Sequence, residues 1–255
     1  MRATTIILGL ALAACGQPAE PPPAQEESVF VRVPPPWFIC DAINIPAVFV
    51  LDRTGPDVRI AEYAKADGSI VQRNGYSVGV EEGAAGSVNI ELYRDGGSDG
   101  AARYTNPGML ETPGSAYTAR FIALQLDGRD IQCRWTPRTR VLAFTTRRSI
   151  VVREDAAGAL SYSAYNFADA GNQRATDGAE NARTTAASLE LENGAAAQTP
   201  QASTYTFETQ GFRYVLSLNR DGTGSLDVTR DGAPLQSEPL IGYQIGMPPA
   251  AAPAQ

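Results

Sequence analysis

The sequence predicts an all-β protein: an antiparallel sandwich or barrel, followed by a smaller C-terminal β segment. Short runs of β-branched and aromatic residues recur along the chain, and turn dipeptides that contain Gly separate many of them. No window of a dozen residues sustains the periodicity of an amphipathic helix. Both termini are rich in Pro and Ala and are expected to be disordered.

The apolar runs place the expected strands in order along the chain. In the first part they predict strands over residues 29–33, 37–40, 47–51, 58–64, 76–80, 88–92, 117–126, 130–135, 139–146, 149–154 and 160–167. Tight turns are expected at Asx-Gly dipeptides, namely Asp67-Gly68, Asn74-Gly75 and Asp127-Gly128. Residues 96–115 are dense in Gly and Pro, which predicts a long loop.

The C-terminal part is expected to hold fewer strands. Residues 168–203 are polar and small apart from Leu189 and Leu191, which indicates a linker or long loop with one short strand. Strands are then predicted over residues 205–207, 212–218, 225–229 and 240–245, with turns at Asp221-Gly222 and Asp231-Gly232. The segment after Leu51 is echoed after Leu216, and generic hairpin sequence is favoured over duplicated units as the explanation.

The N-terminus carries a signal for export. The apolar run from Ala3 to Ala14 is about a dozen residues long, against roughly 20 for a helix that spans a bilayer. Its end, Leu12-Ala13-Ala14-Cys15, resembles the lipobox of bacterial lipoproteins. That resemblance implies cleavage before Cys15 and lipid chains on this residue. Gly16 stands where an Asp would imply retention at the inner membrane, so an outer-membrane anchor facing the periplasm is expected.

The lipoprotein resemblance sets the role of the other cysteines. With Cys15 committed to lipid, Cys40 and Cys133 are left in an oxidising compartment, where a structural disulfide is expected. The chain-entropy model gives such a bond roughly 4 to 5 kcal/mol. A redox-active pair is the alternative, although the usual CxxC spacing is missing.

These signals divide the chain into six expected parts. They are a signal peptide (1–14), a lipid anchor with a Pro-rich tether (15–28), a β domain with the disulfide (29–167), a linker or long loop (168–203), a C-terminal β segment (204–246) and a disordered tail (247–255).

Composition excludes several classes of activity. The chain contains no histidine, which removes the Ser-His-Asp and Cys-His catalytic arrangements and His-ligated zinc. The net charge of −7 argues against nucleic acid as a partner. Paired carboxylates such as Asp127 and Asp130, or Asp41 and Asp52, are not distinguished from ordinary turn and surface acids. No catalytic residue, metal ligand or cofactor is therefore expected.

One basic series stands out in this acidic chain. It comprises Arg134, Arg138, Arg140, Arg147, Arg148 and Arg153. An exposed arginine patch would suit phosphates or another acidic envelope polymer, because guanidinium groups bind phosphate bidentately. The competing interpretation is a solvated sheet face on which each arginine pairs with Asp or Glu on a neighbouring strand. The sequence favours the second interpretation, and the series is the first choice for an anion-binding surface.

A second resemblance covers at most residues 29–135. C-type lysozyme inhibitors are lipid-anchored β-barrels in which an early cysteine is bonded to a late one. Two segments of this chain look similar to the segments around those cysteines: Phe38-Ile39-Cys40 near the start, and Leu126-Asp127-Gly128 with Cys133 near the end. The serine-rich inhibitory loop of that family is not recognisable here, and the cysteines lie farther apart. No inhibitory residue is therefore carried over.

The expected function is a binding or structural role in the periplasm, without catalysis. The membrane is a partner through the N-terminal lipid, and an envelope protein or anionic polymer is a further expected partner. Inhibition of a cell-wall hydrolase is the alternative, and a hydrolase that uses carboxylates alone ranks third.

Overall fold

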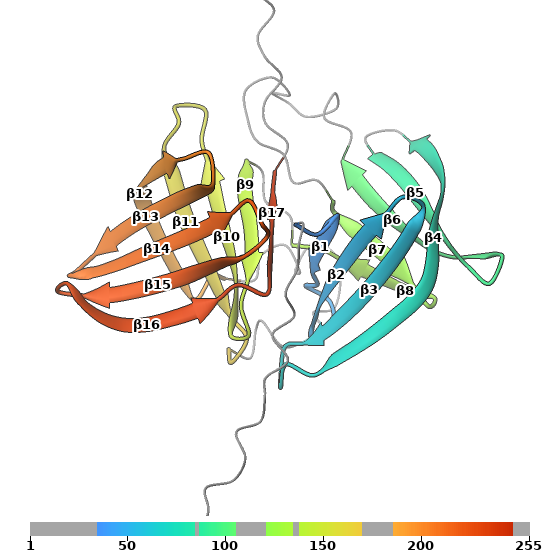
Figure 1. Cartoon of the computed structure of the whole chain (residues 1–255), viewed down its shortest axis with the longest axis horizontal. Helices are drawn as coiled ribbons and strands as arrows, with labels where there is room; N and C mark the ends of the chain where they lie inside the picture. The colour runs from blue at the N-terminus through green and yellow to red at the C-terminus, as the bar shows by residue number, and fades with distance from the viewer. Residues whose placement is uncertain (1–34, 85–86, 106–120, 135–137, 170–185, 247–255) are drawn as a thin grey trace, which may run out of the picture. The chain divides into compact units, whose positions relative to one another are not determined.

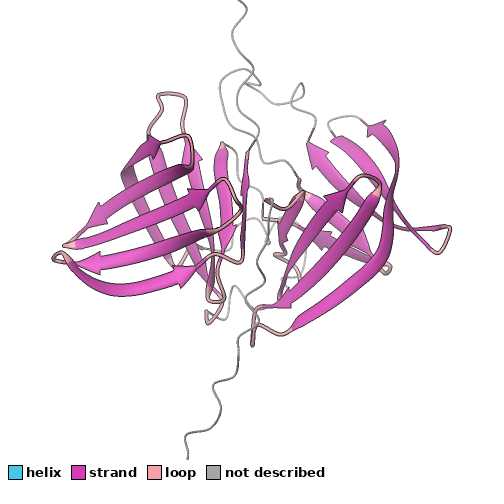
Figure 2. Cartoon of the chain, in the orientation of Figure 1, coloured by secondary structure: helices cyan, strands magenta, loops and turns pink. Residues whose placement is uncertain are grey.

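The structure, a computed structural model, is built from antiparallel strands. It describes residues 35–84, 87–105, 121–134, 138–169 and 186–246, and no helix occurs within these ranges. The strands form two sheets, which Figures 1 and 2 show as separate curved surfaces. The prediction of an all-β antiparallel fold is confirmed. The expected strand over residues 29–33, the tether and the C-terminal tail lie outside the described residues.

The first sheet is a meander in which each strand pairs with the next. Its strands are β1 (Phe38–Asp41), β2 (Ala47–Thr54), β3 (Asp57–Ala64), β4 (Ile70–Ala84), β5 (Ser87–Arg94), β6 (Gly97–Thr105), β7 (Ala123–Leu126) and β8 (Arg129–Gln132). The sheet closes on itself, because Ala42 forms a β-bridge with Cys133 and the amide of Arg134 donates to the carbonyl of Asp41 at 2.7 Å. The result is a closed barrel without a free edge at this seam.

The predicted disulfide crosses that seam. Cys40 lies on β1 and Cys133 directly follows β8, and the two sulfur atoms are bonded. Because the bond joins the first and last strands, it holds the barrel shut covalently. The prediction for Cys40 and Cys133 is confirmed.

The interior of the first barrel is filled by alternate residues of its strands. Along β2, for example, Phe49 and Leu51 point inward while Val48 and Val50 point outward. At one end of the barrel the interior is closed by aromatic rings, since Phe121 stacks on Phe38 with ring centroids 4.1 Å apart. Burial of each such large side chain contributes about 1.5 to 3 kcal/mol.

The second sheet holds nine strands in the order β16-β15-β14-β13-β12-β11-β10-β9-β17. They are β9 (Thr139–Phe144), β10 (Arg148–Glu154), β11 (Leu160–Asn166), β12 (Leu189–Gln198), β13 (Ala202–Thr209), β14 (Phe212–Asn219), β15 (Gly224–Arg230), β16 (Ala233–Pro239) and β17 (Gly242–Ile245). After β16 the chain leaves β15 and pairs through β17 with β9. This return encloses a core around Tyr162, Tyr205 and Phe207 and makes the sheet barrel-like.

A third apolar cluster joins the two sheets. Outward-facing Ile39, Val48 and Val50 of the first sheet pack with Phe144 and Val151 of the second. Polar contacts accompany this packing. The side-chain amide of Gln244 on β17 donates to the carbonyl of Trp37 at 2.8 Å and accepts from the amide of Ile39 at 3.4 Å. The described residues therefore form one compact unit with a shared middle core.

The division between sheets differs from the expected division after residue 167. It falls between β8 and β9, so the strands over residues 139–166 belong to the second sheet. Alternating residues reveal strands, but they do not reveal which strands pair. The second sheet is consequently larger than the predicted C-terminal segment. The expected linker over residues 168–203 supplies the ten-residue strand β12 and the start of β13, while residues 170–185 lie outside the described part.

Two strands were missed because their residues are small or polar. Strand β6 occupies part of the expected loop over residues 96–115 and pairs with both β5 and β7. Among the described side chains of β6, the one fully buried hydrophobic residue is Ala102, so no alternating apolar pattern indicated a strand there. Strand β16 has exposed residues at most positions and lies within the segment that was expected to be a turn and connection.

The expected turn at Asn74-Gly75 is also wrong. Strand β4 continues through it, and the pairing with β3 shifts register there. Gly75 has a φ of +82°, and a bulge uses that conformation as readily as a turn does. By contrast, the turns at Asp127-Gly128 and Asp231-Gly232 are confirmed. Both residues of each pair have positive φ, as a two-residue type I′ hairpin requires.

The internal sequence echo does not relate equivalent strands. Leu51 lies on β2, the second strand of the first meander, whereas Leu216 lies on β14, the sixth strand of the second. Duplicated units would place the echo at matching positions. Generic hairpin sequence is therefore the better explanation.

Candidate binding groove

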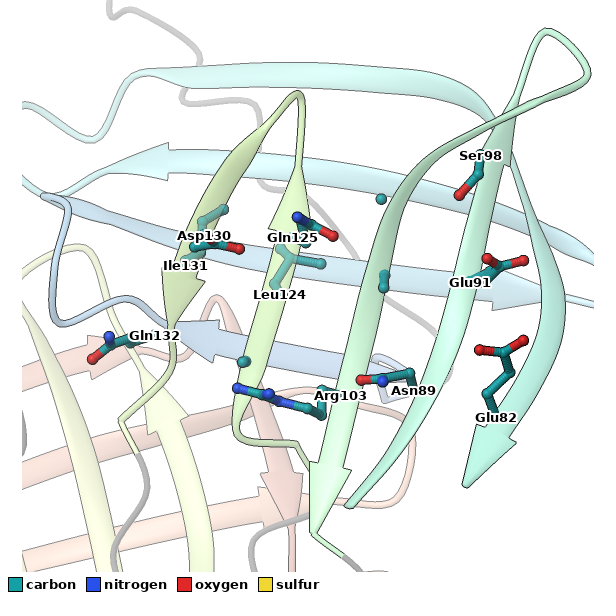
Figure 3. Close-up of a pocket in the computed structure, with 13 residues that line it drawn as sticks. Glu82, Asn89, Glu91, Ser98, Arg103, Leu124, Gln125, Asp130, Ile131 and Gln132 are labelled. Carbon is teal, nitrogen blue, oxygen red and sulfur yellow. The ribbon is translucent and has the colours of Figure 1, made fainter. Parts of the chain in front are cut away.

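A groove of about 550 Å³ lies on the outer surface of the first sheet, over β4 to β8. Figure 3 shows polar side chains from these strands around it. Side chains that face the groove alternate along the strands with side chains of the barrel interior, and the buried residues Leu124 and Ile131 also contribute to the lining. On β5, for instance, Asn89 and Glu91 line the groove while Ile90 and Leu92 are buried inside. The alternation that fills the barrel therefore also builds the groove.

Strand register arranges the lining in two rows that run across the strands. The first, called the Asn89 row, consists of paired positions on β4 to β8: Glu82, Asn89, Arg103, Ala123 and Gln132. The second, called the Gln125 row, runs parallel to it over β5 to β8: Glu91, Ala101, Gln125 and Asp130. Neighbouring strands lie about 4.8 Å apart, so the side chains in each row repeat at that spacing.

The hollow arises because small residues stand in the middle of these rows. Ala101 and Ala123 contribute only methyl groups, while longer side chains rise on either side of them. Gly100 beside them also lacks a side chain, and a Cβ atom there would overlap the carbonyl oxygen of Gln125. Glycine is thus required for β6 to approach β7 this closely.

The polar groups of the groove are largely available to a ligand. In the described part of the chain, the side chains of Asn89, Arg103, Gln125 and Gln132 form no hydrogen bond or ion pair with the protein. Arg103 differs in this respect from Arg73 and the other arginines whose guanidinium groups pair with carboxylates. The groove therefore offers amide donors, amide acceptors and a guanidinium group without internal competitors.

One end of the groove is fixed by a tyrosine. The Tyr93 hydroxyl donates to the carboxylate of Glu91 at 2.5 Å, and this hydrogen bond raises the pKa of Tyr93. The Tyr93 ring lies over Gly79 on β4, where any Cβ atom would overlap it. On the other side Tyr93 pairs across strands with Ser98 of the groove. The position of Glu91 is therefore set by its neighbour.

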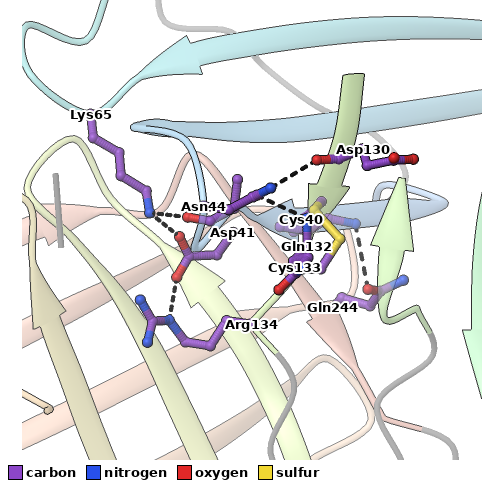
Figure 4. Close-up of a disulfide and its surroundings, with 11 residues drawn as sticks. Cys40, Asp41, Asn44, Lys65, Asp130, Gln132, Cys133, Arg134 and Gln244 are labelled. Atoms are coloured by element: carbon purple, nitrogen blue, oxygen red, sulfur yellow. Dashed lines mark hydrogen bonds and ion pairs between the residues drawn. A yellow bond between two sulfur atoms is a disulfide. The ribbon is translucent and has the colours of Figure 1, made fainter. Parts of the chain in front are cut away.

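A second polar cluster is buried beside the disulfide (Figure 4). The Lys65 ammonium lies 2.5 Å from one carboxylate oxygen of Asp41, and the Arg134 Nε lies 2.6 Å from the other. Lys65 also donates to the carbonyl of Ala42 at 2.6 Å. All three charged side chains are buried, with Asp41 completely so. This Asp41 cluster, namely Asp41, Lys65 and Arg134, ties the end of β1 to two distant points of the chain.

The cluster also meets the second sheet. The Arg134 guanidinium lies 3.5 Å from the ring centroid of Tyr165, and the Lys65 ammonium lies 5.6 Å from that of Phe167. Burial by itself raises the pKa of Asp41, but Lys65 and Arg134 overcome that effect and lower the pKa to about 2. Burial also lowers the pKa of Lys65. The cluster is a closed structural network, and its carboxylate is committed to two cations.

A third network joins side chains of β3, β4, β5 and β8 with the turn between β7 and β8. Glu62 pairs with Arg73 at 2.8 Å and with Arg129 at 3.1 Å, while Asp127 pairs with Arg73 at 2.6 Å and with Arg94 at 3.2 Å. Burial raises the pKa of Glu62, but hydrogen bonds from Arg129 and Arg73 lower it overall. Asp127 is thus held by two arginines, as Asp41 is held by Lys65 and Arg134. One carboxylate of each acid pair considered from the sequence, Asp41 and Asp127, is therefore committed to cations.

The predicted arginine series does not form one exposed surface. Arg134 is buried in the Asp41 cluster, Arg140 pairs with Glu154, and Arg148 pairs with Glu238 at 2.9 Å. Of the other members, Arg147 is exposed, while Arg138 and Arg153 are half-buried. The interpretation of arginines paired on neighbouring strands fits Arg140 on β9 with Glu154 on β10, but not Arg148 on β10, whose partner Glu238 lies on the distant strand β16. It also fails for Arg134, which pairs with Asp41 across the seam but is buried and not on a solvated face.

The groove could not be predicted from the sequence. Its residues are ordinary polar positions in hairpins, and only the register of five strands brings them together. In the described ranges no cluster of three or more His, Cys, Asp or Glu residues is arranged to hold a metal ion. Those ranges also contain no helix long and apolar enough to cross a membrane.

No family model, curated protein or solved structure matches this chain. The groove is therefore the basis for assigning a function.

Proposed function

We propose that this protein is a lipid-anchored component of the bacterial envelope that binds a partner in the groove over β4 to β8. It performs no catalysis. The observation that carries this proposal is the pair of cross-strand rows, in which Asn89, Arg103 and Gln125 present polar groups that the described chain leaves unpaired. Folding places those groups around a hollow of about 550 Å³, at the size of ordinary ligand sites.

Two independent features support a location outside the cytoplasm. Leu12-Ala13-Ala14-Cys15 has the form of a lipobox, and the disulfide between Cys40 and Cys133 is typical of proteins outside the cytoplasm. Two or more acyl chains on Cys15 would give a durable anchor, since each buried CH₂ contributes about 0.8 kcal/mol. The binding groove would then work at a membrane surface.

The anchor is tested with a Cys15→Ser variant. The wild-type protein should fractionate with membranes, and its intact mass should equal the chain from Cys15 onward plus lipid. The variant should appear in the soluble fraction with no lipid mass. An unlipidated wild-type protein would contradict the anchor, whatever the groove does.

The groove is tested by photo-crosslinking in intact envelopes. A photoreactive residue replaces Gln125, in the centre of the Gln125 row, or Gln72, an exposed glutamine of β4 outside the groove. Crosslinked products should form from position 125 and be absent or much weaker at position 72. Equal products from both positions, or none from position 125, would contradict binding in the groove.

Inhibition of a basic cell-wall hydrolase is the second candidate. It is favoured by one observation: the groove carries three carboxylates, Glu82, Glu91 and Asp130, against the single cation Arg103. An acidic groove would attract a basic enzyme. At near-stoichiometric ratio the protein should slow lysis of cell walls by lysozyme, and a Glu82→Gln, Glu91→Gln variant should slow it less. Unchanged lysis with the wild-type protein would remove that target.

A further inference from the structure

We infer that the groove holds an uncharged glycan strand, whose sugar units lie one after another across β4 to β8. This inference deepens the proposed function and rests on it. The ligand class is defined by its chemistry: a chain of pyranose units that present hydroxyl and acetamido groups.

The mixture of polar groups points to this ligand class. A sugar hydroxyl both donates and accepts hydrogen bonds, so its best partners are amides, carboxylates and guanidinium groups placed side by side. The groove offers this combination in Asn89, Arg103, Gln125 and Asp130. These side chains come from four adjacent strands, so hydrogen-bond donors and acceptors lie close together across the groove.

The spacing of the rows suits a polymer of rings. Side chains in the Asn89 row repeat at about 4.8 Å, the distance between neighbouring strands. That distance is close to the length of one pyranose unit in an extended chain. The row crosses five strands, which gives a span of about 19 Å, enough for several consecutive units. A single monosaccharide would leave most of the row unused.

The floor of the groove admits a ring. Ala101 and Ala123 lie within the two rows and contribute only methyl groups to the floor. Longer polar side chains flank this low region. A flat ring can therefore approach the backbone of β6 and β7 while the flanking side chains reach its edge groups.

The charges of the groove distinguish this ligand from polymers of other kinds. Glu82, Glu91 and Asp130 outnumber Arg103, so an anionic polymer would be repelled. A purely cationic ligand would use the carboxylates but would leave the amides idle and meet Arg103 unfavourably. An uncharged glycan uses all of these groups, which is the basis for preferring it.

The test uses full-length protein purified in detergent and two probes. One probe is the soluble tetramer of N-acetylglucosamine, measured by calorimetric titration, and the other is insoluble chitin, the uncharged polymer of the same sugar, measured by co-sedimentation. Both should bind the wild-type protein. Asn89→Ala and Gln125→Ala should each weaken tetramer binding by about three- to tenfold, the effect of losing one hydrogen bond. Ala123→Trp should abolish binding by filling the hollow.

Matched controls separate binding from folding. Gln72→Ala removes an exposed glutamine from β4 outside the groove, and Ala197→Trp adds a ring to an exposed position of β12 in the second sheet. Both should bind like the wild type. Thermal unfolding of every variant should match the wild type within a few degrees, and Glu91→Gln provides a second, nearly isosteric groove variant if Ala123→Trp is unstable.

The outcomes separate this inference from the proposed function. If the wild type binds neither glycan probe but binds lysozyme in a way that Glu91→Gln weakens, the glycan inference is overturned and the groove remains a binding site. If glycan binds but no groove variant weakens it, the groove assignment itself is overturned. If the groove variants alone weaken binding, the inference is supported.

Discussion

At the scale of single residues, the Asp41 cluster is the most demanding feature of the molecule. Asp41 is completely buried, as are the charged groups of Lys65 and Arg134, apart from a few per cent of their surface. Removing such charges from water is costly unless each finds a partner. Asp41 supplies a partner to both cations, so the stability of this region depends on one carboxylate.

Asp41→Asn should therefore be strongly destabilising. The substitution keeps the shape of the side chain but leaves Lys65 and Arg134 buried without a counter-charge, which costs about 3 to 5 kcal/mol. Urea unfolding followed by circular dichroism measures the loss. As a control, Glu208→Gln removes the exposed partner of Arg213, 3.7 Å away, and should change stability by less than about 1 kcal/mol. Similar losses for the two variants would contradict the role of the cluster.

The same cluster predicts a dependence on acid. The folded pKa of Asp41, about 2, is below its ordinary value of 3.8, so folding favours the charged carboxylate. Its contribution, on the order of 2 kcal/mol, is complete above about pH 5 and is lost as the pH falls through the ordinary pKa toward 2. The difference in unfolding free energy between wild type and Asp41→Asn should shrink between pH 5 and pH 2. A difference that stays constant over this range would argue against the lowered pKa.

The partner of a side chain could be predicted from the sequence only where its chemistry allows few partners. Cys40 could pair with little other than Cys133 once Cys15 was assigned to lipid, and the disulfide is found. An arginine can pair with any carboxylate that the fold brings near. The partner of Arg134 is Asp41, 93 residues earlier in the chain, and no local pattern could have named it. The groove was missed for the same reason.

At the scale of elements, hairpins explain both the success and the failures of prediction. Strands with an apolar face and Asp-Gly turns, such as β14 and β15 with Asp231-Gly232 after them, were found from alternation alone. Strands β6 and β16 lack that face, and their hydrogen bonds to neighbours hold them in the sheet. Pairing partners, unlike alternation, cannot be read along one strand.

Close packing at a strand glycine gives an element-scale prediction. A Cβ atom at Gly194 on β12 would overlap the ring of Phe207, which is fully buried in the second core. Gly194→Ala should therefore force this ring to move and destabilise the protein by about 1 to 3 kcal/mol. Gly83→Ala on β4 meets no atom within 4 Å and should be close to neutral. Thermal unfolding compares the two, and equal melting temperatures would refute the overlap.

The disulfide that closes the first barrel gives a second prediction at the scale of elements. Cys133→Ser should lower the unfolding free energy by about 2 to 5 kcal/mol, because the unfolded chain is no longer cross-linked between its first and last strands. Dithiothreitol should destabilise the wild type by a similar amount and leave the variant unchanged. Chemical denaturation with and without the reductant measures both effects. If dithiothreitol also destabilised the variant, its effect on the wild type would not arise from this disulfide.

At the scale of the whole molecule, the cluster shared by the two sheets decides whether they unfold together. Val50 and Ile39 from the first sheet pack with Phe144 and Val151 from the second, and the Asp41 cluster contacts Tyr165 beside them. An apolar contact of this kind couples the stabilities of the parts it joins. The predicted boundary after residue 167 would have divided the second sheet between two domains.

Val151→Asp should break this coupling. A carboxylate at this buried position would face the apolar residues of the other sheet, at a cost of several kcal/mol. In a Trp135→Phe background, tryptophan fluorescence reports on the first sheet through Trp37, and it should give transitions that coincide with far-ultraviolet circular dichroism without Val151→Asp and separate from it with Val151→Asp. Leu235→Asp, at an exposed position of β16, should leave one transition. One transition in Val151→Asp would contradict the coupling.

The seam of the first barrel also bears on how the protein is made. A chain exported from its N-terminus presents Cys40 long before Cys133 emerges, while Cys15 is already outside and much nearer in sequence. Shorter loops close more readily, so a free thiol at position 15 would capture Cys40 first and leave the barrel open. Under the proposed anchoring, acylation of the Cys15 sulfur removes this competitor. The lipid would then act as a protecting group during synthesis, before it acts as an anchor.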